Sequence, residues 1–292
     1  MKKFMMWVLI AVCIVPLSAT DLFDAIVTGN LANVTHAIEE GAPVDAVDSR
    51  GLTALGAAIE YLITHPQEDY DVLELLIHEG VDINQKMMLS GYDEISPLAF
   101  SMMAELELLE DEEDMSAMTY DVATWLIHHG ADVNTRTDGI PLFFAPVMTG
   151  SADVLALMIR EGVHVNARDE QGYSALYYPI TQYMFEYSDE YYDAFSLLVA
   201  SGYNLNTWDS EGKTILTHAA ELGNPQLIKF LLESGVDPTL LSLIGETAFN
   251  SAPYNEKLAD SDEYWQLCDA HYLAMDALIL KMQPYIMLSN MY

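Results

Sequence analysis

The stretch from Glu211 to Pro238, EGKTILTHAAELGNPQLIKFLLESGVDP, decides the fold because it contains two short helices joined by a break. The first predicted helix starts at Thr214, and the break over 222–225 ends in a proline, which suits the first turn of a helix. The second helix has apolar residues at helical period. It stops at Gly235, since glycine adopts the left-handed cap conformation at no steric cost. A single helix pair of this size cannot bury the apolar faces of both helices by itself. The stretch therefore predicts further copies of the same unit beside it.

The copies emerge when the glycine that ends each second helix is aligned. The aligned glycines, whose gaps are 39, 50, 32, 40 and 33 residues, are Gly41, Gly80, Gly130, Gly162, Gly202 and Gly235. The residue three positions before each glycine is apolar in every copy. After four of them the chain continues with Val81-Asp82-Ile83-Asn84, Ala131-Asp132-Val133-Asn134, Val163-His164-Val165-Asn166 and Tyr203-Asn204-Leu205-Asn206. The shorter gaps indicate one repeating unit, and the longer gaps indicate the same unit with an insertion.

This glycine-to-asparagine pattern closely resembles the hairpin of ankyrin repeats, whose period is about 33 residues. The resemblance covers roughly residues 21 to 286. It implies an all-α solenoid of about seven helix-pair repeats with short β-hairpin fingers and acidic insertions. The predicted repeats lie near 21–50, 51–90, 91–138, 139–170, 171–210, 211–243 and 244–286. The threonine-proline-leucine-histidine box of the family is degenerate here, and its histidine is replaced by Gly56, Ala99, Phe143, Tyr177 and Thr217.

A different kind of segment precedes the repeats. Lys2 and Lys3 stand before an apolar run from Phe4 to Leu17, and small residues follow it. This is the order of a secretory signal peptide, and the run is shorter than the roughly 17–25 residues that span a bilayer. We therefore expect residues 1–19 to be a bacterial-type signal peptide and residues 20–292 to form the repeat domain. The mature product is expected to be periplasmic or secreted, without membrane insertion; an uncleaved anchor is the alternative.

The charge of the chain restricts its partners. The formal net charge is −34 at pH 7. A surface this negative repels phosphate backbones and anionic headgroups, which argues against nucleic acids and membrane surfaces as partners. It favours a protein partner, in particular a basic one, and speeds association with it. The alternative is that the charge only keeps the protein soluble.

The predicted insertions lie between the two helices of a repeat, at 61–70, 104–120, 181–192 and 253–272. Seven acids occur among the ten residues 105–114, a composition typical of a solvated or disordered segment. In the third insertion Tyr187 and Tyr191 alternate with acidic residues. Tyrosines are enriched at binding surfaces, but they also fill irregular gaps between repeats. Both interpretations of these tyrosines stay open.

The fingers are the preferred recognition surface, because the ankyrin resemblance places partners there. An apolar cluster at the tip of the longer second finger is expected to be exposed, and such patches mark contact sites. Basic residues on the fingers are candidates too, although the usual ankyrin hairpin explains them structurally. The candidate finger residues are Lys86, Met87, Met88, Leu89, Tyr92, Arg136, Arg168 and Trp208.

Motifs that carry chemistry are sparse in this sequence. It contains no nucleophile elbow, zinc-binding helix, P-loop or dinucleotide-binding glycine pattern. We therefore predict no catalytic residues, no metal site and no cofactor. The sequence favours a non-enzymatic exported protein-binding module, in its sharper form a periplasmic inhibitor or immunity protein for a toxin. The alternatives are a secreted effector that binds host proteins and a hydrolytic or metal-dependent activity within the insertions.

Overall fold

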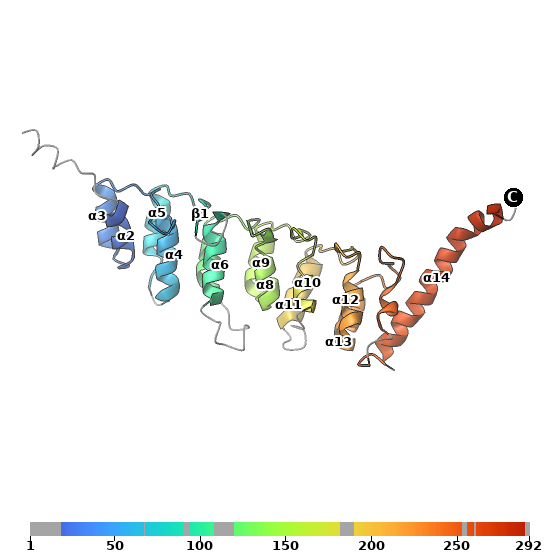
Figure 1. Cartoon of the computed structure of the whole chain (residues 1–292). Coiled ribbons are helices and arrows are strands. Elements are labelled where there is room, and N and C mark those ends of the chain that lie inside the picture. The colour runs from blue at the N-terminus through green and yellow to red at the C-terminus, as the bar shows by residue number, and fades with distance from the viewer. Residues whose placement is uncertain are drawn as a thin grey trace, which may run out of the picture. The chain divides into compact units, whose positions relative to one another are not determined.

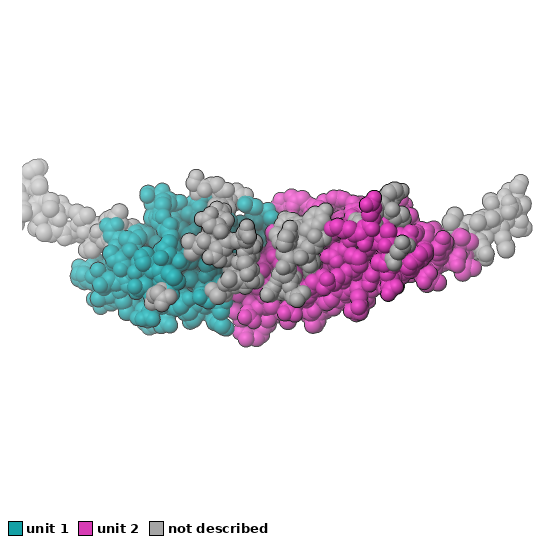
Figure 2. All heavy atoms as spheres, turned by 90° about the horizontal axis from the view of Figure 1, so that it is seen from below, with its two compact units in different colours: residues 1–142 teal, residues 143–292 magenta. Residues whose placement is uncertain are grey.

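The computed structural model describes residues 19–66, 68–89, 94–107, 120–181, 190–252, 256–259 and 261–289. The predicted signal peptide lies outside these residues, apart from Ala19. The chain forms two compact units, residues 1–142 and 143–292, which are coloured separately in Figure 2. Both units consist of helix pairs connected by fingers, as Figure 1 shows.

Unit 1 contains three helix pairs among the residues that the structure describes. They are α2 (Ala19–Ile26) with α3 (Leu31–Glu39), α4 (Ala54–Thr64) with α5 (Asp71–His78), and α6 (Pro97–Glu107) with α7 (Asp121–His128). Two fingers form antiparallel strand pairs, β1 (Met87–Met88) with β2 (Glu94–Ile95) and β3 (Arg136–Thr137) with β4 (Ile140–Pro141). The finger of the first pair closes through the single bridge Val47–Thr53.

Unit 2 continues the helix-pair pattern. Its pairs are α8 (Phe144–Thr149) with α9 (Ala152–Arg160), α10 (Tyr177–Thr181) with α11 (Glu190–Ala200), and α12 (Ile215–Leu222) with α13 (Pro225–Glu233), followed by the short η3 (Ala248–Asn250) and the long α14 (Asp262–Ser289). The predicted all-α architecture of helix pairs is confirmed. None of the helices within the described ranges is both long and apolar enough to cross a membrane.

The last repeat departs from the expectation. Residues 253–272 were expected to be an insertion between two helices, but α14 already begins at Asp262. The first helix of this repeat is reduced to the single turn of η3. The second part of the predicted insertion is therefore helical, because its apolar residues pack against η3 and α13.

The stretch that decides the fold has the predicted local structure. The Thr214 hydroxyl accepts a hydrogen bond from the amide of Thr217 and caps α12, and the Asn224 side chain caps α13 in the same way. Gly223 ends α12 with φ +72°, in the left-handed region. Leu227, Ile228 and Leu231 on the inner face of α13 are fully buried. Burying a side chain of this size stabilises the fold by about 1.5–3 kcal/mol.

Asparagine side chains connect successive repeats. The Asn166 Oδ1 accepts a hydrogen bond from the Asn204 amide at 2.7 Å, and its Nδ2 donates to the Gly202 carbonyl at 3.0 Å. Asn206 makes the equivalent pair of bonds, to the Asp237 amide at 2.8 Å and the Gly235 carbonyl at 3.5 Å. In unit 1, Asn84 does the same with the Asp132 amide and the Gly130 carbonyl. The asparagine of the repeat pattern is thus the polar link between one finger and the next.

At Gly56, which replaces the histidine of the threonine-proline-leucine-histidine box, the packing of another side chain fills the space that the histidine would occupy. Gly56 is buried, and a Cβ on it would lie 2.3 Å from the sulfur of Met87. Met87 is fully buried because the two-residue strand β1 alternates its side chains, with Met87 facing inward and Met88 outward. The thioether therefore fills space that a larger box residue would occupy.

Glu105 links the two helices of the third repeat. Its Oε1 accepts a hydrogen bond from the Val122 amide at 2.9 Å, at the start of α7, while its Oε2 is buried without a hydrogen-bond partner among the described residues. Burial raises the pKa of Glu105 to about 7, and the nearby Asp121 carboxylate adds to the rise, whereas the backbone amides oppose it. The third helix pair therefore holds a carboxyl that is harder to ionise than one in water.

Replacing Asn166 with alanine is expected to lower the free energy of unfolding by about 1–2 kcal/mol, because two inter-repeat hydrogen bonds are lost. Glu170→Ala, at another exposed position of the same finger, serves as the control and should change stability by no more than about 0.5 kcal/mol. Urea unfolding followed by circular dichroism measures both. Equal effects of the two variants would show that the asparagine link contributes nothing specific.

Glu105→Gln is expected to remove part of the pH dependence of stability. The folded pKa, about 7, lies above the ordinary value of 4.5, so the folded state holds the proton more tightly than the unfolded state. The stabilisation is complete below about pH 4.5 and is lost as the pH rises through about 7. Between pH 5 and 8 the wild type should lose on the order of 2 kcal/mol more than the variant. If the free energy of unfolding of the wild type and of the variant changed equally over this pH range, this pH dependence would not come from Glu105.

Candidate binding surface

Three fingers of unit 2 build the candidate surface: residues 166–174, 206–214 and 237–246. Each turn is held by a short polar side chain. The Asp209 carboxylate accepts the amides of Glu211 and Lys213, Asp169 accepts the amide of Tyr173, and the hydroxyl of Ser242 plays the same part in the third finger. Such side chains stabilise tight turns by replacing a backbone acceptor. The finger tips are therefore fixed by their own sequence.

The second and third fingers are joined directly. The indole nitrogen of Trp208 donates a hydrogen bond to the Leu241 carbonyl at 2.7 Å, and the Leu243 amide donates to the Gly212 carbonyl at 2.9 Å. Gly212 has φ +77°, and a Cβ on it would lie 2.7 Å from the Cβ of Leu243. Glycine at this position permits both the turn and the close approach of the third finger.

The joined fingers expose three apolar side chains. Trp208 is 40% exposed, Leu243 73% and Ile244 78%. We call these three residues the finger-tip patch. Singly exposed apolar residues are common, but a group of large ones on one rigid edge is typical of a contact site.

Exposed acidic side chains lie on the same fingers as the finger-tip patch. Glu170, Glu211, Asp237 and Glu246 are all exposed on the same three fingers. Glu211 accepts a hydrogen bond from the Tyr173 hydroxyl at 2.8 Å, which lowers the pKa of Glu211 and raises that of Tyr173 to about 12. The Lys213 ammonium lies 3.4 Å from Glu211 and 2.9 Å from Glu221. The edge of the patch therefore presents mainly negative charge.

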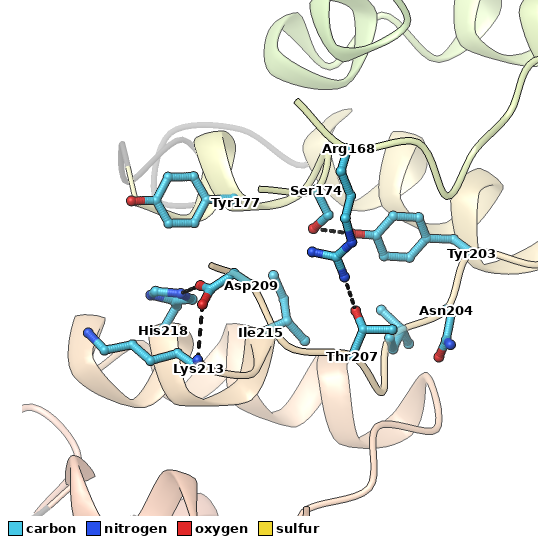
Figure 3. A pocket seen from close by; sticks show the side chains of 11 residues that line it. Arg168, Ser174, Tyr177, Tyr203, Asn204, Thr207, Asp209, Lys213, Ile215 and His218 are labelled. Carbon is cyan, nitrogen blue, oxygen red and sulfur yellow. Dashed lines mark hydrogen bonds and ion pairs between the residues drawn. The ribbon is translucent and has the colours of Figure 1, made fainter. Parts of the chain in front are cut away.

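A small pocket lies beneath the first two fingers (Figure 3), and its polar side chains bind one another. Arg168 donates to the Thr207 hydroxyl at 2.7 Å, Tyr203 donates to the Ser174 hydroxyl at 2.6 Å, and His218 lies 2.5 Å from Asp209. The free space is about 20 Å³, enough for about one water molecule. The arrangement connects fingers and leaves too little room for an organic substrate.

A larger hollow of about 320 Å³ lies in unit 1, beside the first finger. Its walls include Phe23, Val27 and Val47, and the valines are each 55% exposed. Arg50 also lines it, but the guanidinium of this residue already makes ion pairs with Asp48 and Glu60 at 2.9 and 2.8 Å. Asp24, Asp48 and Ser49 line the hollow as well, so its walls are partly apolar and partly polar.

The predicted finger residues of unit 1 do not form one exposed cluster. The expectation that Met87 is exposed is wrong, since it is fully buried against Gly56, whereas Met88 is 67% exposed and Leu89 half-buried. Lys86 is exposed and pairs with Glu94 at 3.0 Å across the strands. Tyr92 lies outside the described residues.

The other predicted residues are divided in the same way. Arg136 and Arg168 each donate to a carbonyl of their own finger, Gly139 and Gly172, which matches the structural alternative. Tyr191 is buried at 7% exposure because it faces the interior of the repeat, so its expected place on a contact surface is wrong. Tyr187 lies outside the described residues.

Leu243 and Ile244 were missed by the sequence analysis, although a signal for them exists. In the corresponding positions before the turn glycine, three other fingers carry polar pairs, Ser49-Arg50, Glu170-Gln171 and Ser210-Glu211. An apolar pair at a polar position of a repeat indicates a contact residue. Without the structure, the same pair is equally compatible with core packing of the irregular last repeat.

Fold and surface together define a helical-repeat scaffold with projecting fingers. A family model, "Ankyrin repeats (many copies)", matches residues 184–232. Among solved structures, the chain is similar to the human ASB11 ankyrin repeat domain (18% identity, 86% of this chain and 97% of that one, TM-score 0.54). It is also similar to an ankyrin repeat domain from Acinetobacter baumannii AYE (24% identity, 74% and 97%, TM-score 0.57).

The ankyrin repeat domain of Bcl-3, a member of the IkappaB protein family, shows the same likeness, with 20% identity over 85% of this chain and 97% of that one and a TM-score of 0.59. No curated protein sequence matches the chain. The predicted resemblance is confirmed: this is an ankyrin-repeat fold. Ankyrin repeats are in general non-enzymatic scaffolds that bind proteins, so the fold indicates a protein–protein interaction module.

Gly212→Ala is expected to destabilise the chain more than Gly245→Ala. Both glycines have positive φ, +77° and +83°, so each alanine costs about 1–2 kcal/mol of backbone strain. Only at Gly212 does the new methyl group also collide with Leu243, while nothing lies within 4 Å of the Cβ position at Gly245. Thermal unfolding of the two variants measures the difference. Equal losses would show that the third finger does not press against the second.

Proposed function

We propose that this chain is a non-enzymatic binding module that holds a protein partner at the finger-tip patch. The observation that carries the proposal is the exposure of Leu243 and Ile244, 73% and 78%, on a finger fixed by hydrogen bonds from Trp208 and Leu243. Rigid apolar side chains bind with little loss of conformational entropy. The patch therefore supplies the apolar centre that a protein interface needs.

The partner is expected to present basic residues around an apolar centre. Glu170, Glu211, Asp237 and Glu246 are exposed on the fingers that carry the patch, and the whole chain carries a net charge of −34. Opposite charges at the rim accelerate association and exclude wrong partners. The same charge disfavours nucleic acids, whose phosphates it repels.

In its sharper form, the proposal is that the protein is an exported bacterial inhibitor, such as an immunity protein that neutralises a toxin in the periplasm. It is supported by the signal-peptide pattern of residues 1–19 and by the acidic surface, which suits a basic active-site region. The alternative is a secreted effector that binds host proteins. Fractionation separates the two, because an inhibitor is retained in the periplasm and an effector is found outside the cell.

The decisive test of the binding module compares a double substitution in the finger-tip patch with a single substitution in the second finger. The tagged chain is used to capture partners from periplasmic extract, and the captured protein is then purified and titrated against each variant. Leu243→Ser/Ile244→Ser is expected to weaken binding at least tenfold, since removing a central apolar contact from an interface commonly costs more than about 1 kcal/mol. Met88→Ser, which alters the exposed methionine of the second finger, should change affinity less than threefold.

The outcomes of this test distinguish binding at the second finger from binding at the finger-tip patch. They also distinguish the general binding module from the periplasmic inhibitor. If Met88→Ser abolishes binding and the double variant does not, the partner binds in unit 1 and the finger-tip patch is not the site. If a specific partner binds at the patch but is not a toxin, the module stands and the inhibitor proposal fails. If no partner binds with an affinity tighter than micromolar, both fail.

A further inference from the structure

Among the side chains that the structure describes, helix α14 packs against the rest of unit 2 along one face. Its buried residues Leu267, Ala270 and Ala274 recur every three or four positions and lie against η3 and α13. From Asp276 to Lys281 every side chain is exposed. In Figure 1 the helix accordingly runs on beyond the last repeat.

The opposite face carries two apolar rows with acids between them. Trp265, Tyr272 and Ile279, which are 54%, 64% and 55% exposed, follow one another every seven residues. Leu273 and Leu280, each 64% exposed, form a second row with the same spacing. Seven residues are close to two helical turns, so each row runs along the helix with little drift.

The acidic row lies between the apolar rows. Asp269 and Asp276 are exposed and are also seven residues apart. Asp276 is three or four positions from Tyr272, Leu273, Ile279 and Leu280, and residues so spaced are neighbours on a helix surface. Leu, Ile, Tyr and Trp side chains thus flank a line of negative charge on both sides. We call this face of α14, defined by these seven residues, the α14 stripe.

We propose that the α14 stripe is a second docking surface, which binds an amphipathic helical segment of a protein partner that carries a row of lysine or arginine between two apolar rows. Helices that pair along a seven-residue repeat bury their apolar rows against each other, and charged rows select the partner. The two aspartates provide the complementary charge for a basic row. Desolvation by the flanking apolar side chains strengthens this attraction relative to open water.

Charge also decides against a second copy as the occupant. Pairing two α14 stripes would place Asp269 and Asp276 against the same aspartates, and like charges at an interface are costly. Two chains of net charge −34 also repel each other. This surface lies on a different element from the finger-tip patch, so the proposal stands independently of the function proposed for the fingers.

A synthetic helical peptide with a seven-residue repeat of leucines flanking one lysine row is the probe, titrated by fluorescence anisotropy against the full chain. Asp269→Lys/Asp276→Lys is expected to weaken its binding at least tenfold. The matched control, Glu39→Lys/Glu40→Lys, makes the same change of net charge at exposed positions at the end of α3 and should weaken it less than threefold. Circular dichroism verifies that both variants remain folded.

A second pair of variants tests the apolar rows. Leu273→Ser/Leu280→Ser should weaken peptide binding at least tenfold, whereas Leu243→Ser/Ile244→Ser in the finger-tip patch should leave it unchanged. A peptide with glutamate in place of lysine should not bind. The finger variants thus report on the function proposed above, and the α14 variants report on this surface alone.

Several results would overturn the proposal. Equal losses in the two charge variants would mean that only diffuse attraction to an acidic chain is measured. Binding of the glutamate peptide, or absence of saturable binding of the lysine peptide, would remove the charge argument. Self-association of the wild type in analytical ultracentrifugation, abolished by Leu273→Ser/Leu280→Ser, would identify a second copy as the occupant instead.

Discussion

The structure depends on one polar contact that recurs within each unit, the asparagine side chain that joins a finger to the next repeat. An asparagine has both a donor and an acceptor, so Asn166 and Asn206 each satisfy an amide and a carbonyl of the following repeat at once. The apolar faces of the helices supply most of the stabilisation. They are not directional, however, and the asparagine fixes the spacing at which they stack. Each repeat then needs contact only with its neighbours.

The rigidity of the fingers follows from this contact. Within the described part of unit 2, each finger is held by a polar side chain in its own turn and by a hydrogen bond to a neighbouring finger, as Trp208 shows with Leu241. The half-buried Arg168 and the buried Tyr203 make their hydrogen bonds within these links. Side chains left at the tips are consequently displayed on a fixed frame, and this arrangement suits recognition better than catalysis.

The last repeat shows how a small change in the pattern creates a different surface. Its first helix is a single turn, and its second helix is longer than any other described helix of the chain. The inner face of α14 continues the stack through Leu267 and Ala274. Its outer face repeats every seven residues, a spacing that serves pairing with another helix rather than packing within a stack.

The sequence alone determined the helix pairs, their caps and their links, because these depend on residues close together in the chain. Helical period, the glycine stops, the helix start at Thr214, the proline after the break and the repeated glycine-to-asparagine pattern all predicted what the structure contains. Only the tertiary structure decided which face a neighbouring segment covers. Met87 is buried because Gly56 leaves space for it, Tyr191 turns inward, and Glu105 reaches the start of α7. Leu243 and Ile244 remain exposed because no element packs over the third finger among the described residues. Periodicity shows which residues share a face, but contacts between distant segments determine whether that face is covered.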